Sequence, residues 1–225
     1  MCGRFTLSTP ADQIARLFDL SDIPSFEKRY NIAPTQDVPV CRELGDGSPT
    51  RKVSPLHWGL VPFWADDRKI GNRMINARGE TVANKPAFRA AFKYRRCLVP
   101  ADGFYEWKKE NGGKQPYLIK RSDDAPFAFA GVWEQWSDED NQKLESFSII
   151  TCDAADWLSE LHDRMPVILP SDKFDFWLSP DNEDYDALQD LLQPWAMGDA
   201  MEYFPVSKDV NRPQNDRPEV VEPIG

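Results

Sequence analysis

Histidine is scarce in this chain, and its cysteines form no recognisable ligand or disulfide pattern. Only His57 and His162 occur among 225 residues, and the four cysteines are far apart, with no Cys-x-x-Cys pair. Zinc sites need clustered Cys and His ligands, and small disulfide scaffolds need many cysteines. The sequence therefore predicts no metal site, no disulfide framework and no other cofactor.

Long apolar runs are also missing. No stretch approaches the roughly 20 apolar residues that a membrane-spanning helix needs. The first residues, MCGRFTLSTPADQ, lack the basic and apolar regions of a secretory signal. We therefore expect a cytoplasmic protein without a membrane partner, in a compartment that keeps thiols reduced.

Positive charge is in deficit overall but concentrated in one part of the chain. The net charge is −10, yet residues 1–109 carry 18 Lys and Arg against 12 Asp and Glu. Between Arg68 and Arg96 nine basic residues accompany a single acid, Glu80. Such an asymmetry is typical of a polyanion-binding surface, or of a solvated basic face with an acidic back.

Short strand-like runs dominate the rest of the sequence. Its length suits one large domain with a sizeable core. Runs rich in β-branched and aromatic residues predict strands around 38–42, 56–60, 96–99, 104–108, 117–120, 127–134 and 147–151. Apolar spacing predicts a short helix capped by Thr9 and opened by Pro10, and helices over 86–94, 154–162, 171–178 and 184–192.

This mixture of elements predicts the fold class. Many short strands, interspersed helices and 19 prolines favour an α+β fold with a curved, largely antiparallel β-sheet or barrel-like core and peripheral helices. Asn111-Gly112-Gly113 predicts a hairpin turn. Residues 211–225 hold few large apolar side chains and predict an extended tail that wraps the surface or frays.

The N-terminus carries the most distinctive chemistry. Because Cys is small, Met1 is expected to be removed, which leaves Cys2 as the first residue. An N-terminal cysteine is a 1,2-aminothiol with reference pKa values of about 8 for the amine and about 8.5 for the thiol. With an aldehyde, the amine forms a Schiff base and the thiol then closes a thiazolidine ring. Cys2 is thus a candidate covalent nucleophile, although Met-Cys-Gly-Arg alone is more often an unstructured start.

Three further residues are candidates for acid–base or positioning roles. Glu106 lies on an alternating strand and shares a face with Phe104, where apolar surroundings would raise its pKa; a solvent-facing carboxylate is the alternative. His162 ends a predicted helix, whose dipole would favour the protonated form of a proton shuttle, or it caps that helix. Asn76 could hold an amine or a sugar oxygen, or cap a turn.

Taken together, several motifs resemble one family. In order they are MCGRF at 1–5, YNIAP at 30–34, WGLVPFW at 58–64, INARGET at 75–81, RCLVPADGFYEW at 96–107, HDRMP at 162–166 and VSKDVN at 206–211. This succession closely resembles the SRAP family, the SOS-response-associated peptidases or abasic-site processing proteins. One departure is Ala65, where many members carry a second aromatic residue.

The resemblance implies a single SRAP domain over residues 1–225, monomeric and nucleoid-associated if bacterial. Its implied partner is single-stranded DNA, or a single-strand–duplex junction, that contains an abasic site. It further implies that Cys2 traps the ring-opened abasic aldehyde as a thiazolidine crosslink, with Asn76, Glu106 and His162 completing the catalytic site. Strand scission and autoproteolysis are further family activities. The DNA-binding residues that it implies are Arg4, Asn31, Pro34, Trp64 and Arg78.

Two alternatives belong to other functional classes. Glutaminase-type N-terminal-nucleophile amidohydrolases also begin with Cys-Gly, but apolar residues follow where this chain has Arg4. A non-catalytic module that binds single-stranded DNA would not depend on Cys2 at all. A glutaminase assay and an abasic-oligonucleotide crosslinking assay separate the three hypotheses.

Overall fold

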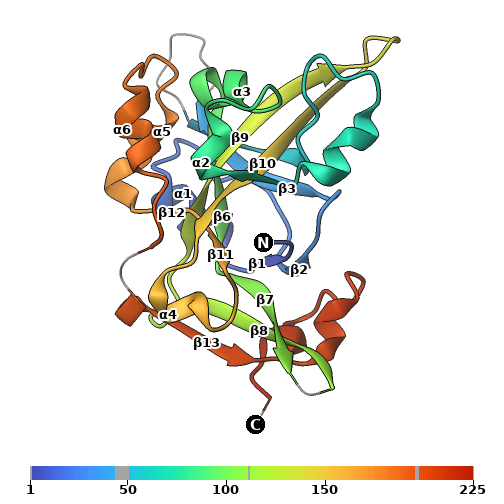
Figure 1. Ribbon diagram of the computed structural model, residues 1–225, viewed down its shortest axis with the longest axis vertical. Helices are drawn as coiled ribbons and strands as arrows, with labels where there is room; N and C mark the ends of the chain where they lie inside the picture. Colours follow the sequence, from blue (N-terminus) through green and yellow to red (C-terminus); the bar gives the residue numbers. More distant parts are fainter. Residues whose placement is uncertain (1, 44–50, 111, 196–197, 225) are drawn as a thin grey trace.

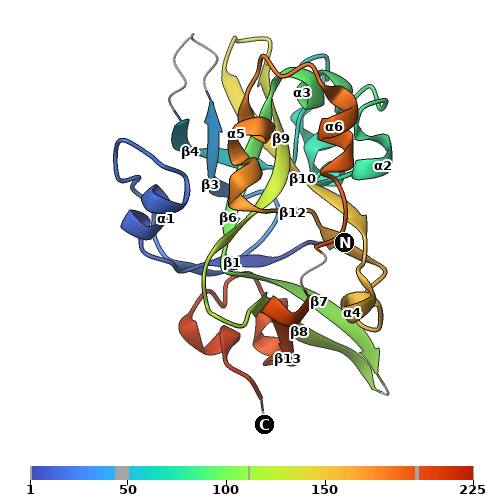
Figure 2. The same cartoon turned by 90° about the vertical axis from the view of Figure 1, so that its left-hand side faces the viewer.

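Two β-sheets form the centre of the computed structural model, which describes residues 2–43, 51–110, 112–195 and 198–224. Most strand pairs are antiparallel, and short helices surround the strands (Figures 1 and 2). The structure confirms the predicted α+β class with a curved, barrel-like core and peripheral helices. Among the described residues no helix is long and apolar enough to cross a membrane.

Five strands of the larger sheet close into a ring. Each strand hydrogen-bonds to the next, and β9 pairs back with β10 to complete the circuit. The order is β10 (Lys143–Asp153), β4 (Arg51–Trp58), β3 (Asp37–Glu43), β6 (Arg96–Ala101) and β9 (Phe127–Ser137). Three short strands extend this ring: β5 (Asn76–Arg78), β11 (Arg164–Pro166) and β12 (Ile168–Leu169).

The second sheet has five strands and packs against the ring. Its order is β13 (Met201–Pro205), β8 (Gly113–Arg121), β7 (Gly103–Glu110), β1 (Phe5–Leu7) and β2 (Arg29–Ile32). Phe5 of β1 is fully buried, and its ring lies 5.1 Å from Trp58 of β4 and 5.8 Å from Phe129 of β9. The start of the chain is therefore fixed where the two sheets meet.

The helices are short and lie outside these sheets (Figure 1). The α-helices are α1 (Ala11–Leu17), α2 (Gly79–Val82), α3 (Arg89–Tyr94), α4 (Asp156–Ser159), α5 (Phe174–Leu178) and α6 (Tyr185–Asp190). The 3₁₀ helices are η1 (Arg68–Arg73), η2 (Ser171–Lys173), η3 (Gly198–Ala200), η4 (Lys208–Asn211) and η5 (Pro218–Val221).

Each strand predicted from the sequence falls within an observed strand or overlaps one, but one boundary was wrong. The strand expected at 56–60 ends at Trp58, because Gly59 has a φ of +136° and packs against the backbone of Gly71. A Cβ atom at Gly59 would lie 2.7 Å from the Gly71 carbonyl oxygen. Only glycine tolerates this turn and this close approach.

Several helix predictions also needed correction. The helix expected over 154–162 is the single turn of α4, and the helix expected at 86–94 begins at Arg89. Thr9 does not cap α1, because its hydroxyl donates to Asp102 instead. In the predicted hairpin turn Gly112 and Gly113 have positive φ, whereas Asn111 lies outside the described residues.

The C-terminal segment packs against the body of the protein rather than fraying. Val210 and Val220 are buried, and Val206 forms a bridge with Pro223. Tyr105, Leu118 and Val206 share a second apolar cluster with them. The 3₁₀ turn η5 lies within residues 211–225, and η4 comes directly before them.

Candidate active site

Cys2 lies three residues before the start of β1 and is completely buried. The side-chain amide of Asn76 donates to its carbonyl oxygen at 2.8 Å. Asn76 begins β5, whose backbone pairs with β10 at Ile149. Trp58 also holds this segment, because its indole N–H donates to the Ile75 carbonyl at 2.9 Å. Both anchors of Asn76 thus belong to the barrel, and Asn76 fixes the start of the chain.

The side-chain oxygen of Asn76 can still accept a hydrogen bond. Its Oδ1 is buried and has no hydrogen-bond partner in the described parts of the chain. An unsatisfied buried acceptor costs about 1–3 kcal/mol. Nδ2 of the same amide donates to the Cys2 carbonyl, so Oδ1 also lies close to Cys2. An α-amino group on Cys2 is a donor of the kind that this oxygen accepts.

Glu106 is brought to the same region by β7. Phe104 packs into the main core, whereas Tyr105 and Trp107 belong to the second cluster on the opposite face of the strand. Glu106 therefore points with Phe104 toward the main core, and it is only 3% exposed. This burial raises the pKa of Glu106 to about 7. The sequence-based expectation of a raised carboxyl pKa is confirmed.

His162 faces Glu106 across a short gap. Its Nε2 lies 3.7 Å from Oε2 of Glu106. Two groups meet its other nitrogen: the Arg164 backbone N–H donates to Nδ1 at 2.9 Å, and an Asp163 carboxylate oxygen lies 2.8 Å away. A neutral ring accepts from Arg164 and carries its proton on Nε2, toward Glu106, whereas a protonated ring can donate to Asp163.

The electrostatic expectation for His162 was wrong. Burial lowers its pKa, whereas a helix C-terminus would raise it. The preceding helix α4 is a single turn from Asp156 to Ser159, so it contributes only a weak dipole, and desolvation dominates. The pKa of Glu106 is raised to about 7 and the pKa of His162 is lowered, so the Glu106 carboxyl can both donate and accept a proton near neutral pH. This is the property that general acid–base catalysis requires.

The Glu106 carboxyl should make the folded chain less stable as pH rises. Its pKa moves from 4.5 to about 7, so the folded state keeps a proton that the unfolded state loses between these values. The favourable contribution is present below the unfolded pKa and is lost as pH rises through the folded pKa. At about 1.4 kcal/mol per pKa unit, the loss is on the order of 3 kcal/mol.

Denaturant unfolding at pH 5 and pH 8 measures this loss, with Glu106→Gln as the comparison. The lowered pKa of His162 acts in the opposite direction, since protonation destabilises the fold as pH falls. The difference between the two chains isolates Glu106, because both retain His162. Equal pH dependence in wild type and variant would contradict the assigned environment of Glu106.

The Cys2 thiol is held in its neutral form. Burial raises its pKa well above the ordinary value, and the nearby charge of Glu106 raises it further. A buried neutral thiol is a weak first nucleophile, because the thiolate is the reactive species.

Arg4 and Asn31 occupy a buried network beside this site. One terminal nitrogen of Arg4, Nη1, donates at 2.6 Å to both Oδ1 of Asn31 and the Val210 carbonyl. Asn31 is completely buried, and its Nδ2 faces three backbone carbonyls. Asn31 therefore positions other groups rather than meeting solvent, and Arg4 is only partly exposed.

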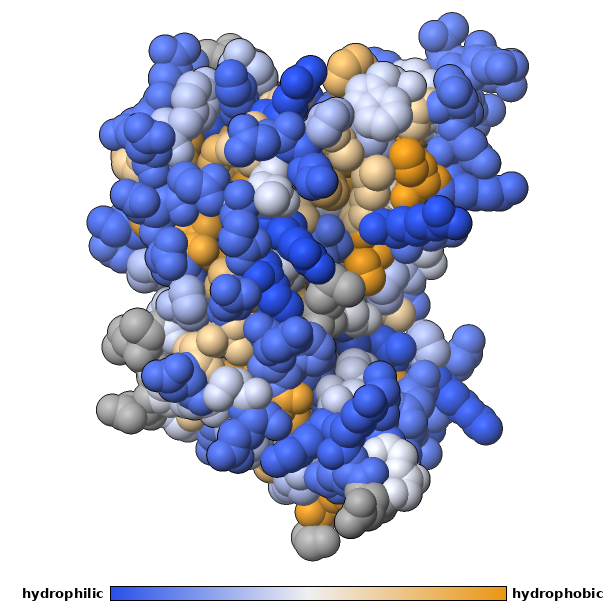
Figure 3. Space-filling view, in the orientation of Figure 1, coloured by the Kyte–Doolittle hydropathy of each residue, from blue (hydrophilic) through white to orange (hydrophobic). Residues whose placement is uncertain are grey.

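The remaining expected DNA contacts lie at the surface. Trp64 is 48% exposed and its neighbour Phe63 is 60% exposed. Arg78 is exposed two positions after Asn76, and Pro34 is half-buried. The face shown in Figure 3 is largely hydrophilic, with small apolar spots. These surface residues are not in hydrogen-bond contact with the Cys2 site in the described structure.

The basic segment 68–96 divides into two groups. Arg95 pairs with Glu134, and the buried guanidinium of Arg96 donates to four backbone carbonyls, so both serve the fold. Seven others are exposed and form no ion pair with the described residues: Arg68, Lys69, Arg73, Arg78, Lys85, Arg89 and Lys93. On a chain of net charge −10, these uncompensated cations favour an anionic ligand.

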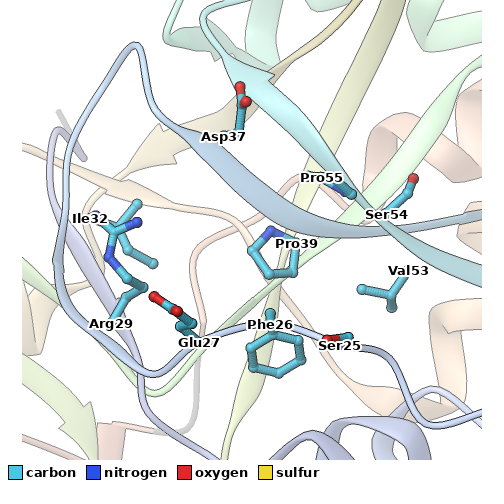
Figure 4. A pocket seen from close by; sticks show the side chains of 10 residues that line it. All are labelled: Ser25, Phe26, Glu27, Arg29, Ile32, Asp37, Pro39, Val53, Ser54 and Pro55. Atoms are coloured by element: carbon cyan, nitrogen blue, oxygen red, sulfur yellow. The ribbon is translucent and has the colours of Figure 1, made fainter.

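The described residues hold no metal-binding cluster, and the cavity in Figure 4 lies apart from this site. Across the described ranges no group of three Cys, His, Asp or Glu side chains could hold a metal ion. A separate cavity of about 260 Å³ lies beside β3 and β4 (Figure 4). Its walls are mainly apolar, and it contains none of the predicted catalytic residues. The lining includes Phe26, Ile32, Pro39, Val53 and Pro55.

Sequence reasoning missed some residues that shape the site. Asp163 contacts His162, and residues 210–216 contact Arg4 and Asn31. The motifs HDRMP and VSKDVN mark parts of both segments. The contacts of residues 210–216 with Arg4 and Asn31 join positions distant along the chain, which local patterns do not reveal, whereas Asp163 directly follows His162 in the sequence.

Fold and site together define a β-barrel domain with a buried cysteine at residue 2 beside a carboxyl–imidazole pair. The model of the SOS response associated peptidase (SRAP) family matches residues 1–213. Abasic site processing protein YoaM of Bacillus subtilis is 44% identical over 99% of this chain and 98% of its own length. YedK of Escherichia coli, with the same descriptive name, is 31% identical over the full length of both chains.

The fold comparison agrees with the sequence comparison. A crystal structure of a Bacteroides thetaiotaomicron protein superposes with a TM-score of 0.86 and 26% identity, over 99% of this chain and 100% of that one. The chain belongs to the SRAP family. Its relatives are named for abasic-site processing, which supports a role in processing DNA that contains abasic sites.

Proposed function

We propose that this protein captures abasic sites in single-stranded DNA by forming a covalent thiazolidine through Cys2. The observation that carries the proposal is the convergence of a buried Cys2, the Asn76 amide that holds it and the Glu106–His162 pair. The names of the relatives support the same substrate class. The proposal requires that Met1 is removed, so that Cys2 carries both a free amine and a thiol.

The first chemical step is ring opening of the sugar. An abasic deoxyribose exists mainly as a closed hemiacetal, which has no electrophilic aldehyde. Opening removes the proton of the C1′ hydroxyl, forms the C1′ carbonyl and delivers a proton to the ring oxygen. Glu106, with a pKa of about 7, can serve as either proton acceptor or donor. His162 is the neighbouring group with which Glu106 can exchange this proton.

The second step joins the protein to the DNA. The Cys2 amine attacks C1′, and loss of the carbonyl oxygen as water leaves a Schiff base. The thiol then adds to the C=N bond, so that a carbon–sulfur bond forms and the thiol proton moves to nitrogen. Asn76 Oδ1, buried and unsatisfied, is the acceptor that would orient the amine for attack. The balance is one aldehyde plus one aminothiol giving one thiazolidine and one water.

The Schiff base has a competing fate. Loss of a C2′ proton would eliminate the 3′ phosphate and cut the strand, which is abasic-site lyase chemistry. Closure of the thiazolidine ring removes the electron-withdrawing iminium and stops this elimination. We therefore propose crosslinking as the main outcome and strand scission as the side reaction, and we assign no autoproteolytic step.

The exposed residues suit a single strand as the ligand. Trp64 can stack on an unpaired base, and base–aromatic stacking contributes about 1–3 kcal/mol. Arg4 and Arg78 are the proposed phosphate contacts, and the half-buried Pro34 is proposed to contact the strand. A direct contact of Asn31 with DNA is not part of this proposal, because its side chain is buried and fully engaged.

Intact-mass measurement tests the proposal directly. The purified chain should lack Met1, and after incubation with an oligonucleotide that carries one abasic site it should gain the oligonucleotide mass less one water. The adduct should survive heat and denaturant without borohydride reduction. An intact oligonucleotide of the same sequence is the control. A chain that binds the abasic strand but gives no adduct would be a binding module.

A further inference from the structure

Arg4 is a cation held in place without being neutralised. Its Nη1 donates to the Asn31 amide oxygen and to the Val210 carbonyl, both at 2.6 Å. Both acceptors are neutral, and no carboxylate of the described residues forms an ion pair with Arg4. The Trp107 ring lies 5.9 Å from its guanidinium carbon. The second terminal nitrogen, Nη2, makes no hydrogen bond in the described structure, which leaves it available to an anion.

Asn31 fixes one of those acceptors through the C-terminal segment. Its Nδ2 lies 3.2 Å from the Val210 carbonyl, 3.0 Å from that of Arg212 and 2.9 Å from that of Asn215. Three carbonyls around one amide nitrogen determine which way the amide points. Oδ1 is therefore directed at Arg4. Asp could not replace Asn31, because its carboxylate oxygen would face three carbonyl oxygens and could donate to none of them.

Asp216 fastens the same segment to β2. Its Oδ1 accepts from the backbone N–H of Tyr30 at 2.5 Å and from that of Asn31 at 3.0 Å. Its Oδ2 forms an ion pair with Arg29. Residues 210–216 thus contact Asn31 in two ways. Their backbone carbonyls accept from its side-chain amide, and the Asp216 carboxylate accepts from its backbone N–H.

The segment also reaches the strand that carries Glu106. The indole N–H of Trp107 donates to Oδ1 of Asn211 at 2.7 Å. Trp107 follows Glu106 directly, and its ring faces Arg4. One C-terminal segment therefore touches both the held cation and the neighbour of the proton-transferring carboxyl.

We infer that residues 210–216 are a positioning part of the DNA-binding site, which hold Arg4 ready for a backbone phosphate beside the captured sugar. Asn31 and Asp216 act through Arg4, and they do not touch DNA themselves. This inference rests on the proposed function, since it takes a DNA phosphate as the anion. The role of the buried Asn31 and of the C-terminal segment in substrate binding is therefore to orient Arg4.

Asp216→Ala tests the inference in the full chain. We expect its affinity for an intact single-stranded oligonucleotide to fall about tenfold, as loss of one charged hydrogen bond would cause. The slope of log K against log salt concentration should shrink by about 0.7, because one phosphate contact is lost. The capture rate at saturating abasic DNA should stay near wild type. Asp123→Ala, which removes another Arg-paired acid from an exposed site, is the charge-matched control.

A conservative variant separates positioning from folding. Asp216→Asn keeps an Oδ1 acceptor for both backbone N–H groups and loses only the Arg29 ion pair, so it should retain most of the affinity. Thermal melting checks that each variant is folded. If Asp216→Ala unfolds under assay conditions, Asn211→Ala is read in its place, since it releases the segment from Trp107 by removing one exposed hydrogen bond and should weaken binding in the same direction. Wild-type affinity and salt slope in every folded variant would overturn the inference.

A double-mutant cycle asks whether Asp216 acts through Arg4. Arg4→Ala should weaken binding in the wild-type background but have little further effect in Asp216→Ala, because the cation is already misplaced there. Fully additive effects would overturn the inference. Because binding is measured on intact DNA, a wild-type chain that binds normally but forms no adduct would reject the capture chemistry alone.

Discussion

Replacing Cys2 by alanine is expected to abolish the covalent adduct while leaving non-covalent DNA binding intact. Alanine retains an α-amine, so a transient Schiff base can still form, but no thiol can close the ring. Since a Schiff base hydrolyses readily, the adduct should appear only after borohydride reduction. The affinity for intact single-stranded DNA should remain close to wild type, because Trp64 and the basic residues are unchanged.

Denaturing gels after incubation with an abasic strand measure this effect, with and without borohydride. Cys41→Ala is the matched control, because Cys41 is also completely buried but lies on β3, which pairs with β4 and β6 and with neither β5 nor β7. The control should crosslink as efficiently as wild type. A full, borohydride-independent adduct from Cys2→Ala would show that another residue is the nucleophile.

Removal of the thiol should also change the ratio of products. Without ring closure the Schiff base persists longer and is open to loss of the C2′ proton. Strand scission per captured site should therefore rise in Cys2→Ala relative to wild type. This outcome would follow from the chemistry of the intermediate, and it needs no rearrangement of the protein.

Local patterns were sufficient to place some of these groups. The alternation of Phe104, Tyr105 and Glu106 along β7 predicted that Glu106 shares the core-facing side with Phe104, and the two apolar clusters agree. Period-two alternation is a property of the strand itself, so it needs no knowledge of the partners. The curved β core followed from the same kind of information.

Environment and long-range contacts could not be predicted in this way. The pKa of His162 depends on its burial in the folded chain, and this burial lowers the pKa where the predicted helix end would have raised it. Asn31 was expected to contact DNA, but a motif identifies an important residue without distinguishing binding from positioning. The Val210 carbonyl, which lies beside the Asn31 amide, also accepts from Arg4, a residue 206 positions earlier in the chain.

Glu106→Gln is expected to slow covalent capture by about 10²–10⁴-fold, the usual contribution of a general acid–base group. Glutamine keeps the size and hydrogen-bonding atoms of the side chain but cannot transfer a proton. Its neutral amide also resembles the protonated carboxyl that burial favours, so the fold should tolerate the change. Single-turnover crosslinking at saturating abasic DNA measures the rate, and affinity for intact DNA should be unaffected.

The substrate itself can show which step needs Glu106. An oligonucleotide with an acyclic aldehyde in place of the abasic sugar has no hemiacetal to open, so it bypasses the step assigned to this carboxyl. The deficit of Glu106→Gln should shrink greatly on that substrate. Glu110→Gln, an exposed change on the same strand, is the control and should react as wild type on both. An equal deficit on both substrates would instead place Glu106 in Schiff-base formation or ring closure, because those are the steps that the two reactions share.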